Sequence, residues 1–366
     1  MLAYIVRRLL LIIPTLFGVM VLNFVIINVA PGGPIEQVIA QLQGTAVGAT
    51  ARFAGGGSET QGTPRRPGTH AASKYHGARG LDPELIRSLE KQFGFDKPAH
   101  ERFFLMMWNF ARFDFGNSFF RDRSVVQLLI DKMPVSISLG LWTTLLVYLI
   151  SIPLGIAKAV RDGAPFDIWT SGVVIVGNAI PGFVFSILLI VLFAGGRYFD
   201  WFPLRGLVSD NWSELTTLGK VADYFWHLTL PIASMVIGGF AGLTLLTKNS
   251  FLDQIHQQYV LTARAKGLSE RRVLYRHVFR NAMLVVIAGF PSAFIDILFT
   301  SALLTEVIFS LDGLGLLGFQ AAINRDYPIM FGTLYIFTLL GLVVNLIADL
   351  TYVFVDPRID FESRET

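Results

Sequence analysis

The sequence predicts an all-α integral membrane protein with six transmembrane helices. Its 366 residues are 53% hydrophobic and only 16% charged, and a mean hydropathy of +0.55 is too high for an ordinary soluble protein. Six segments are also long enough to cross a bilayer, which takes about 20 apolar residues in a helix. Transmembrane β-strands are shorter and alternate in polarity, and these segments do not alternate.

The six predicted helices carry almost no charge. In chain order they cover about residues 9–35, 134–157, 168–196, 228–247, 282–305 and 330–355. Only the last two contain an acid, Asp296 and Asp349 respectively. The first follows Arg7 and Arg8, but it is too long for the apolar region of a cleaved signal peptide. We therefore expect it to be a retained transmembrane helix.

Lysine and arginine residues set the predicted orientation, because short cytoplasmic loops carry an excess of them. Arg7 and Arg8 precede the first helix. The loop between the fourth and fifth helices carries Lys248, Arg264, Lys266, Arg271, Arg272, Arg276 and Arg280. The short loops on the other side carry fewer. The N-terminus, the 248–282 loop and the C-terminus are therefore expected in the cytoplasm.

These helices divide the chain into four predicted parts. Residues 1–35 hold the first helix, 36–133 form a periplasmic segment, 134–356 form the core with helices two to six, and 357–366 are a cytoplasmic tail. Residues 44–80 are rich in Gly, Ala, Thr and Arg, which predicts a flexible insert, although it could also order on an outside partner. Helices are expected from Pro83 and Pro98, and a short amphipathic piece from Val125 to Ile130, before Pro134.

Several kinds of chemistry are not indicated by the sequence. The chain has no cysteine, which excludes disulfides and thiol ligands. It has no phosphate-binding loop or nucleophile turn, and its scattered histidines predict no metal site. We expect no catalytic residue, no cofactor and no nucleic-acid partner. An ATP-driven transporter would need its ATPase on another chain.

The basic loop between the fourth and fifth helices is the most informative segment. Residues 253–265 predict a helix, and Gly267 suits the left-handed position that ends it. Leu268 could pack back on that helix, and Ser269 could cap the next one. Two short helices joined at one glycine would form a rigid unit able to transmit motion. From the residues alone, an ordinary basic cytoplasmic loop remains an equally open interpretation.

Four residues are candidates for lining a substrate pathway. Asn178 and Pro181 bound a stretch that should interrupt the third helix, and Pro291 should interrupt the fifth, because proline frees a backbone carbonyl. Asp296 is an acid within the membrane, as is Asp349, and a proton-driven carrier would use such acids. Simple kinks for packing, and acids paired with a neighbouring helix, are the alternatives.

The run from residue 259 to 281 resembles the coupling loop of ATP-binding-cassette importer permeases. Leu261, Thr262 and Ala263 stand at the family's Glu-Ala-Ala positions and Gly267 at its glycine, although no acid begins the motif and its terminal Leu-Pro is absent. The similarity covers most of the chain and is closest to the "B" permeases of dipeptide and oligopeptide importers. It includes residues 31–32, 93–94, 114–118, 306–309, 313–315, 325–328 and 356–358. The 44–80 insert and residues 310–313 look like the Yej-type importers, a group associated with microcin C uptake.

This resemblance implies a type I importer permease in a Gram-negative inner membrane. The residues implied to contact the ATPase are Leu261, Thr262, Ala263, Arg264, Ala265, Lys266, Gly267, Leu268 and Ser269. The implied partners are a second homologous permease, one or two ATP-binding subunits that hold ATP and Mg, a periplasmic peptide-binding protein, the peptide and membrane lipid. A proton-coupled peptide carrier, a nickel-type permease and a channel or scaffold subunit remain the alternatives.

Overall fold

The computed structural model describes residues 2–29, 33, 35–36, 38–39, 83–92, 95–196, 198–296 and 302–355. The predicted insert at 44–80 and the tail at 357–366 lie outside the described residues. Within them the chain is helical apart from turns and one isolated antiparallel bridge between Asn117 and Ser124. The predicted all-helical class is therefore confirmed for the described part of the chain.

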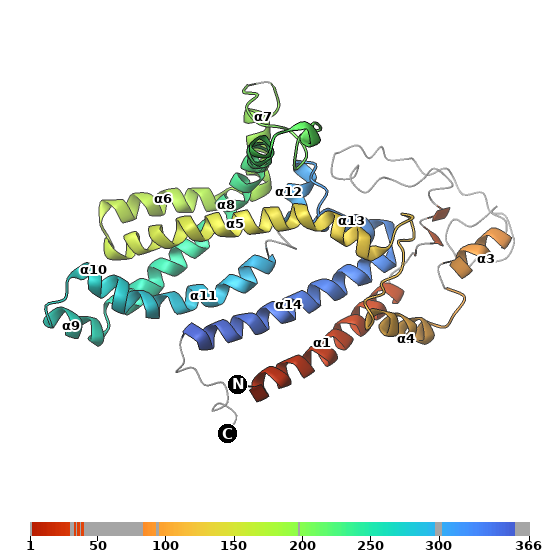
Figure 1. The fold of residues 1–366 in the computed structure, drawn as a ribbon, viewed down its shortest axis with the longest axis horizontal. Coiled ribbons are helices and arrows are strands. Elements are labelled where there is room, and N and C mark those ends of the chain that lie inside the picture. The colour runs from red at the N-terminus through yellow and green to blue at the C-terminus, as the bar shows by residue number, and fades with distance from the viewer. Residues whose placement is uncertain are drawn as a thin grey trace, which may run out of the picture. The chain divides into compact units, whose positions relative to one another are not determined.

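The described helices run in the following order (Figure 1). They are α1 (Leu2–Val29), α3 (Pro83–Gln92), α4 (Ala99–Phe110), α5 (Val125–Val160), α6 (Pro165–Ala179), α7 (Gly182–Phe193), α8 (Thr217–Ile255), α9 (Gln258–Ala265), α10 (Glu270–Arg272), α11 (Phe279–Asp296), α12 (Ala302–Ile308), α13 (Leu314–Asn324) and α14 (Tyr327–Val355). A 3-10 turn covers Trp212–Glu214, and a π-helical stretch, Val273–Val278, leads into α11.

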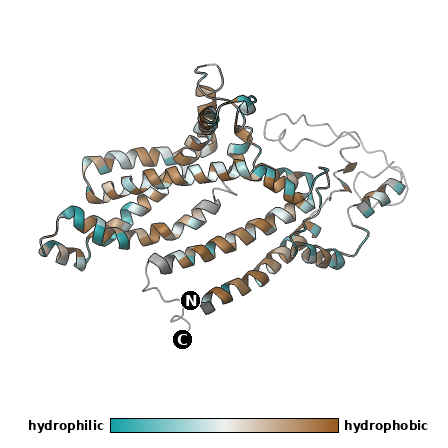
Figure 2. Ribbon diagram, in the orientation of Figure 1, coloured by the Kyte–Doolittle hydropathy of each residue, from teal (hydrophilic) through white to brown (hydrophobic). Residues whose placement is uncertain are grey.

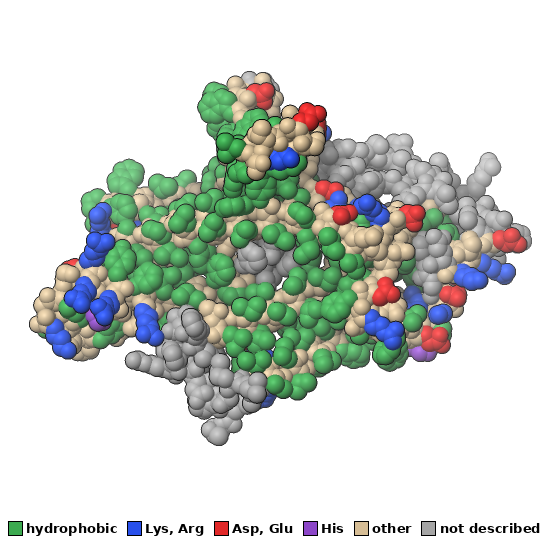
Figure 3. Space-filling view, viewed as in Figure 1, with side chains coloured by type: hydrophobic (Ala, Val, Ile, Leu, Met, Phe, Trp, Pro, Cys, Tyr) green, Lys and Arg blue, Asp and Glu red, His purple; other side chains and the backbone are tan. Residues whose placement is uncertain are grey.

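Five of the described helices are long and apolar enough to cross a membrane, or up to six spans if the bent pair α6 and α7 counts as one. Figure 2 shows the apolar residues along these helices. Many large apolar side chains on them are exposed, Ile13 and Val173 among them, and Figure 3 shows hydrophobic side chains over much of the visible face. Such a surface suits lipid rather than water.

One boundary among the described residues differs from the sequence prediction. The helix expected to begin at Pro134 begins at Val125 and runs through that proline. Val125, Leu128 and Leu129 are buried. Burying such side chains contributes about 1.5–3 kcal/mol each, which outweighs the roughly 3 kcal/mol that an interior proline costs. The range predicted for the fifth helix contains most of α11, which is described as far as Asp296, and the beginning of α12.

The chain divides into two compact units. Unit 1 comprises Met1–Arg8, Lys132–Gly315 and Leu340–Thr366, and unit 2 comprises Leu9–Asp131 and Leu316–Leu339. In unit 1, α8 packs against α6, α7 and α11. Leu139 of α5, Leu189 of α7 and Leu228 of α8 belong to one of its buried clusters.

In unit 2, two of the motifs that carried the resemblance contact each other. The buried carboxylate of Asp326 accepts hydrogen bonds from the Ser118 hydroxyl and, at 3.1 Å, from the backbone N–H of Phe119. Asp114 in turn accepts a bond from the backbone N–H of Gly116 at 3.0 Å, where φ is +72°. Both motifs therefore stabilise the fold of unit 2 through these contacts between described residues.

Candidate functional site

Gly267 ends α9 with a complete Schellman motif. Its backbone N–H donates to the carbonyl of Arg264 at 2.8 Å, and that of Leu268 donates to the carbonyl of Ala263 at 3.3 Å. Gly267 has a φ of +79°, which glycine adopts without strain. Leu268 packs against the buried cluster that contains Ala263, as such motifs favour. The predicted left-handed glycine and the predicted contact of Leu268 are both confirmed.

The segments on either side of Gly267 differ from the prediction. The helix expected over residues 253–265 is broken, since α8 ends at Ile255 and α9 begins at Gln258. The backbone of Gln257 is extended there, with φ −74° and ψ 151°. Ser269 has the backbone of a cap residue, but its side chain makes no capping hydrogen bond. The expectation that its hydroxyl caps the next helix was therefore wrong.

An ion pair crosses the turn between α9 and α10. Arg264 Nε lies 2.9 Å from Glu270 Oε1, and an Arg264 terminal nitrogen donates to Glu270 Oε2 at 3.0 Å. Two parallel bonds of this kind fix the orientation of both side chains. We call residues 258–272 the α9–α10 turn. Its two short helices are joined by the backbone at Gly267 and by this side-chain bridge.

The α9–α10 turn rests on a buried cluster that joins several helices of unit 1. Val260 and Ala263 are buried on the inner side of α9. The cluster also contains Ile156, Ala159, Phe251, Val273, Val278, Ala282, Met283 and Val286. These residues come from α5, α8, the π-helical stretch and α11. A displacement of the turn is therefore passed to all of these elements, because packed interiors are close to incompressible.

The outer side of the turn is exposed. Leu261 on α9 is 55% exposed. Thr262, Arg264, Ala265, Lys266, Gly267 and Ser269 are also exposed, whereas Ala263 is buried and Leu268 is half-buried. The residues predicted to contact a partner thus form one exposed surface, except for these two, which hold that surface in place.

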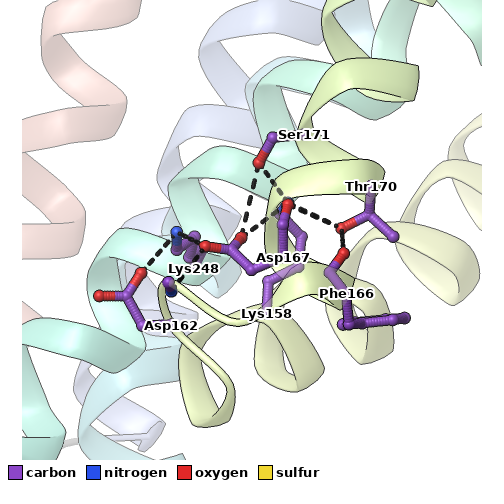
Figure 4. Close-up of polar contacts among 8 residues, drawn as sticks. Lys158, Asp162, Phe166, Asp167, Thr170, Ser171 and Lys248 are labelled. Atoms are coloured by element: carbon purple, nitrogen blue, oxygen red, sulfur yellow. Dashed lines mark hydrogen bonds and ion pairs between the residues drawn. The ribbon is translucent and has the colours of Figure 1, made fainter.

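A buried ion network lies close to this cluster (Figure 4). Lys158 on α5 is fully buried, and its Nζ lies 2.9 Å from Asp167 Oδ1 on α6. Lys248 on α8 lies 2.7 Å from Asp167 Oδ2 and 2.7 Å from Asp162 Oδ1. Two lysines and two aspartates therefore share one site with no net charge, which is what burial of charge requires.

The remaining donors of Lys158 are satisfied by α6. Its Nζ donates to the carbonyl of Asp167 at 3.0 Å, to Thr170 Oγ1 at 3.0 Å and to Ser171 Oγ at 2.6 Å. The network therefore ties the start of α6 to α5 and α8. From the sequence, Lys248 was expected only to contribute to the orientation of the chain in the membrane. Its pairing with Asp167 joins residues far apart in the chain, which no local pattern signals.

Two of the four candidate pathway residues lie on α11, one lies on α6, and Pro181 lies in the break between α6 and α7. The Asn178–Pro181 stretch interrupts the helix as expected, since α6 ends at Ala179 and α7 starts after Pro181 at an angle of 90°. Asn178 and Pro181 are exposed. Pro291 is buried within α11 and does not end it, so its predicted interruption was wrong. Asp296 is the last residue of α11, and its side chain lies outside what the structure describes.

Asp349, the other acid in a predicted span, is paired. Tyr4 on α1 donates a hydrogen bond to Asp349 Oδ2 at 2.9 Å, and an Arg8 terminal nitrogen lies 2.5 Å from the same oxygen. Both partners belong to unit 1. The alternative in which this acid pairs with a neighbouring helix is the one observed. The contact brings the start of α1 to the end of α14.

Comparison with known families identifies the class of protein. Residues 151–361 match the family described as "Binding-protein-dependent transport system inner membrane component". The chain belongs to this family. It is the permease component of an ATP-binding-cassette transporter, a multi-pass inner-membrane protein, and the ATPase is a separate component. Family membership favours the ATP-driven interpretation over a proton-coupled carrier.

Comparison with individual proteins shows which subgroup of these permeases the chain resembles. The chain is 63% identical over 366 residues to the peptidoglycan transport system permease protein YejB of Agrobacterium fabrum, covering 99% of each protein. It is 58% identical over 362 residues to the inner membrane ABC transporter permease protein YejB of Escherichia coli O157:H7, covering 99% of this chain and 100% of that protein. It is 32% identical over 366 residues to the oligopeptide transport system permease protein AppB of Bacillus subtilis, covering 99% and 100%. These matches confirm the resemblance to Yej-type and oligopeptide "B" permeases.

Proposed function

We propose that this chain carries peptides, or compounds that contain peptides, across the inner membrane and is driven by ATPases that grip the α9–α10 turn. The relatives named for peptidoglycan and for oligopeptides support the substrate class. Peptide antibiotics of the microcin C type belong to the same chemical class. The exposed outer surface of the α9–α10 turn supports the coupling role.

Coupling is a mechanical consequence of the packing beneath the turn. When the ATPases close on ATP, they press on the surface formed by residues 261–269. Val260 and Ala263 transmit that displacement to Ile156 on α5 and Phe251 on α8, because all four belong to one buried cluster. The ends of these helices then move with the turn. Opening of the ATPases after hydrolysis reverses the motion.

The ion network extends the moving body to α6. Lys158 lies on α5 between the cluster residues Ile156 and Ala159, and Lys248 precedes the cluster residue Phe251 on α8. Both lysines pair with Asp167 on α6. Displacement of α5 and α8 therefore carries the start of α6 along, and through it the broken α6–α7 segment that holds Asn178 and Pro181.

The full architecture that we propose has six spans in the type I importer arrangement, with both ends cytoplasmic. The contact of Tyr4 and Arg8 with Asp349 supports an even number of spans. It joins the start of α1 to the end of α14, and an odd number would put these ends on opposite sides. The bent pair α6 and α7 then counts as one span. The four sequence-based parts, 1–35, 36–133, 134–356 and 357–366, follow this topology.

The partners we propose are a second homologous permease, one or two ATP-binding subunits that hold ATP and Mg, and a periplasmic peptide-binding protein. The substrate pathway lies between the two permeases and is lined in part by Asn178, Pro181 and Asp296, whereas the buried Pro291 is left out of that lining. Peptide backbones vary little whereas their side chains vary widely. The pathway is therefore wide and weakly selective, and the binding protein selects the substrate.

One purification tests this function. The tagged chain is extracted from its native membrane in mild detergent, its companions are identified, and the complex is reconstituted in vesicles. We expect a second permease and ATP-binding subunits, and uptake of labelled peptide that needs both ATP and the binding protein. Uptake of nickel instead of peptide would change the substrate class. A chain that stays alone and moves peptide on a proton gradient without ATP would overturn the coupling role.

A further inference from the structure

Three arginines surround a shallow hollow where the α9–α10 turn meets the π-helical stretch. The hollow has a volume of about 520 Å³ and is lined by Ser269, Arg271, Arg272, Tyr275 and Arg276. All five residues are exposed. Figure 3 shows Lys and Arg side chains gathered at the end of unit 1 that holds α9 and α10. We call Arg271, Arg272, Tyr275 and Arg276 the arginine patch.

Within the part of the chain that the structure describes, the arginines of this patch have no acidic or hydrogen-bonding partner. The neighbouring cations differ, since Arg264 pairs with Glu270 and Lys248 with Asp162 and Asp167. Like charges that lie close together repel one another. The patch therefore has a strong positive potential that an external anion would relieve.

The position of the patch indicates which anion this is. It lies at the beginning of the candidate membrane span Glu270–Pro291. Tyr275 is 56% exposed, and tyrosine side chains are enriched at the level of lipid headgroups. Further along the same span, Val285 and Phe290 are exposed apolar residues. Along this span the arginines and Tyr275 come first and the apolar residues come after them. A lipid presents its charged headgroup and its acyl chains in the same order.

We propose that the arginine patch binds the phosphate-bearing headgroup of an anionic phospholipid such as phosphatidylglycerol or cardiolipin. Guanidinium groups bind phosphate oxygens through paired N–H donors, and arginines at an anionic membrane surface are attracted to it. The patch directly follows residues 261–269, on which the ATPases press, and Ser269 borders both surfaces. A bound lipid holds the base of the moving turn at the membrane surface.

Native mass spectrometry of the complete transporter in detergent tests the proposal. Phosphatidylglycerol, phosphatidylcholine or inorganic phosphate is titrated in, and the bound molecules are counted. The test variant is Arg271→Gln/Arg272→Gln/Arg276→Gln. A matched variant, Arg87→Gln/Arg112→Gln/Arg205→Gln, removes the same charge from exposed arginines elsewhere. A third variant replaces the patch arginines with lysine, which keeps the charge.

An arginine near an anionic membrane surface contributes about fivefold in affinity, so the test variant should weaken the tightest phosphatidylglycerol site by about a hundredfold. The matched variant should leave that site unchanged, and the lysine variant should keep most of the affinity. Equal binding of phosphatidylglycerol by the test variant and the unchanged protein overturns the proposal. So does binding of inorganic phosphate in place of the lipid. Loss of the ATPase subunits with unchanged lipid binding assigns the patch to the ATPase instead.

Discussion

Arg264 and Glu270 form two parallel hydrogen bonds across the Gly267 turn, at 2.9 and 3.0 Å. Their side chains are 39% and 74% exposed, so the pair contributes little to overall stability, about 0.2–1 kcal/mol. Its effect is to fix the angle between α9 and α10. Because Arg264 is paired, Lys266 is the exposed cation that is left on the surface formed by residues 261–269.

The first prediction concerns this ion pair. Reversing one charge, as in Glu270→Arg, places two guanidinium groups together and should reduce ATP-driven uptake while the protein stays in the membrane. The double variant Arg264→Glu/Glu270→Arg restores an ion pair and should recover much of that uptake. Transport by reconstituted vesicles measures both. If the double variant is no better than the single one, Arg264 or Glu270 acts on a partner rather than on the other residue.

The second prediction concerns the left-handed glycine. A Cβ added at Gly267 would meet no atom within 4 Å, so a substitution there is opposed only by the backbone. That cost is about 1–2 kcal/mol for an ordinary side chain, and asparagine tolerates the conformation better than valine. Gly267→Val should therefore lower uptake much more than Gly267→Asn, at equal abundance in the membrane. Equal uptake by the two variants would show that the turn does not need this backbone.

The third prediction concerns the buried network. Removing one member of a buried ion pair typically costs about 3–5 kcal/mol, and Lys158→Met should lie at the low end because Lys248 still pairs with Asp167. Asp162 is 53% exposed, so Asp162→Asn should cost less than about 1 kcal/mol. Thermal unfolding of the purified transporter compares the two. Similar unfolding temperatures would mean that Lys158 is not a stabilising member of the network.

The fourth prediction concerns the contact between α5 and α8. A Cβ at Gly155 would lie 2.6 Å from Thr247 Cβ and 2.8 Å from the backbone oxygen of Thr244. Because that oxygen belongs to a helix, Gly155→Ala should force the helices apart and cost about 1–3 kcal/mol. Gly172→Ala on α6 is the matched control, since its Cβ would meet nothing within 4 Å. The control should be neutral or slightly stabilising, and an equal loss in both variants would contradict the close approach.

Local chemistry explains which features of the site could be predicted. Glycine suits the left-handed backbone at position 267 better than other residues do, so the end of α9 follows from one residue and its neighbours. The break after Ile255 and the π-helical Val273–Val278 stretch carry no proline and no glycine. They depend on how the chain packs on the cluster beneath it. A periodic pattern could not show them.

Long-range pairing was the other feature that the sequence did not show. Apolar length predicted the helices because burial in lipid depends on composition. Lys158, Asp167 and Lys248 come from three helices, and no spacing relates them. Asp349 was correctly expected near a helix partner as one alternative, but its partners, Tyr4 and Arg8, lie at the opposite end of the sequence.

The last prediction separates a structural role of Asp349 from a role in proton movement. Asp349→Asn removes the ion pair with Arg8, although Tyr4 can still donate to an amide oxygen at that position. Tyr4→Phe is the matched control, because it removes the hydrogen bonds that the Tyr4 hydroxyl makes with Asp349 and Arg8 but keeps the acid and its ion pair with Arg8. A structural acid predicts that both variants keep ATP-driven uptake, with the same dependence on pH as the unchanged protein. If Asp349→Asn alone abolishes uptake or removes its pH dependence, the carboxylate carries protons and the ATP-driven mechanism is incomplete.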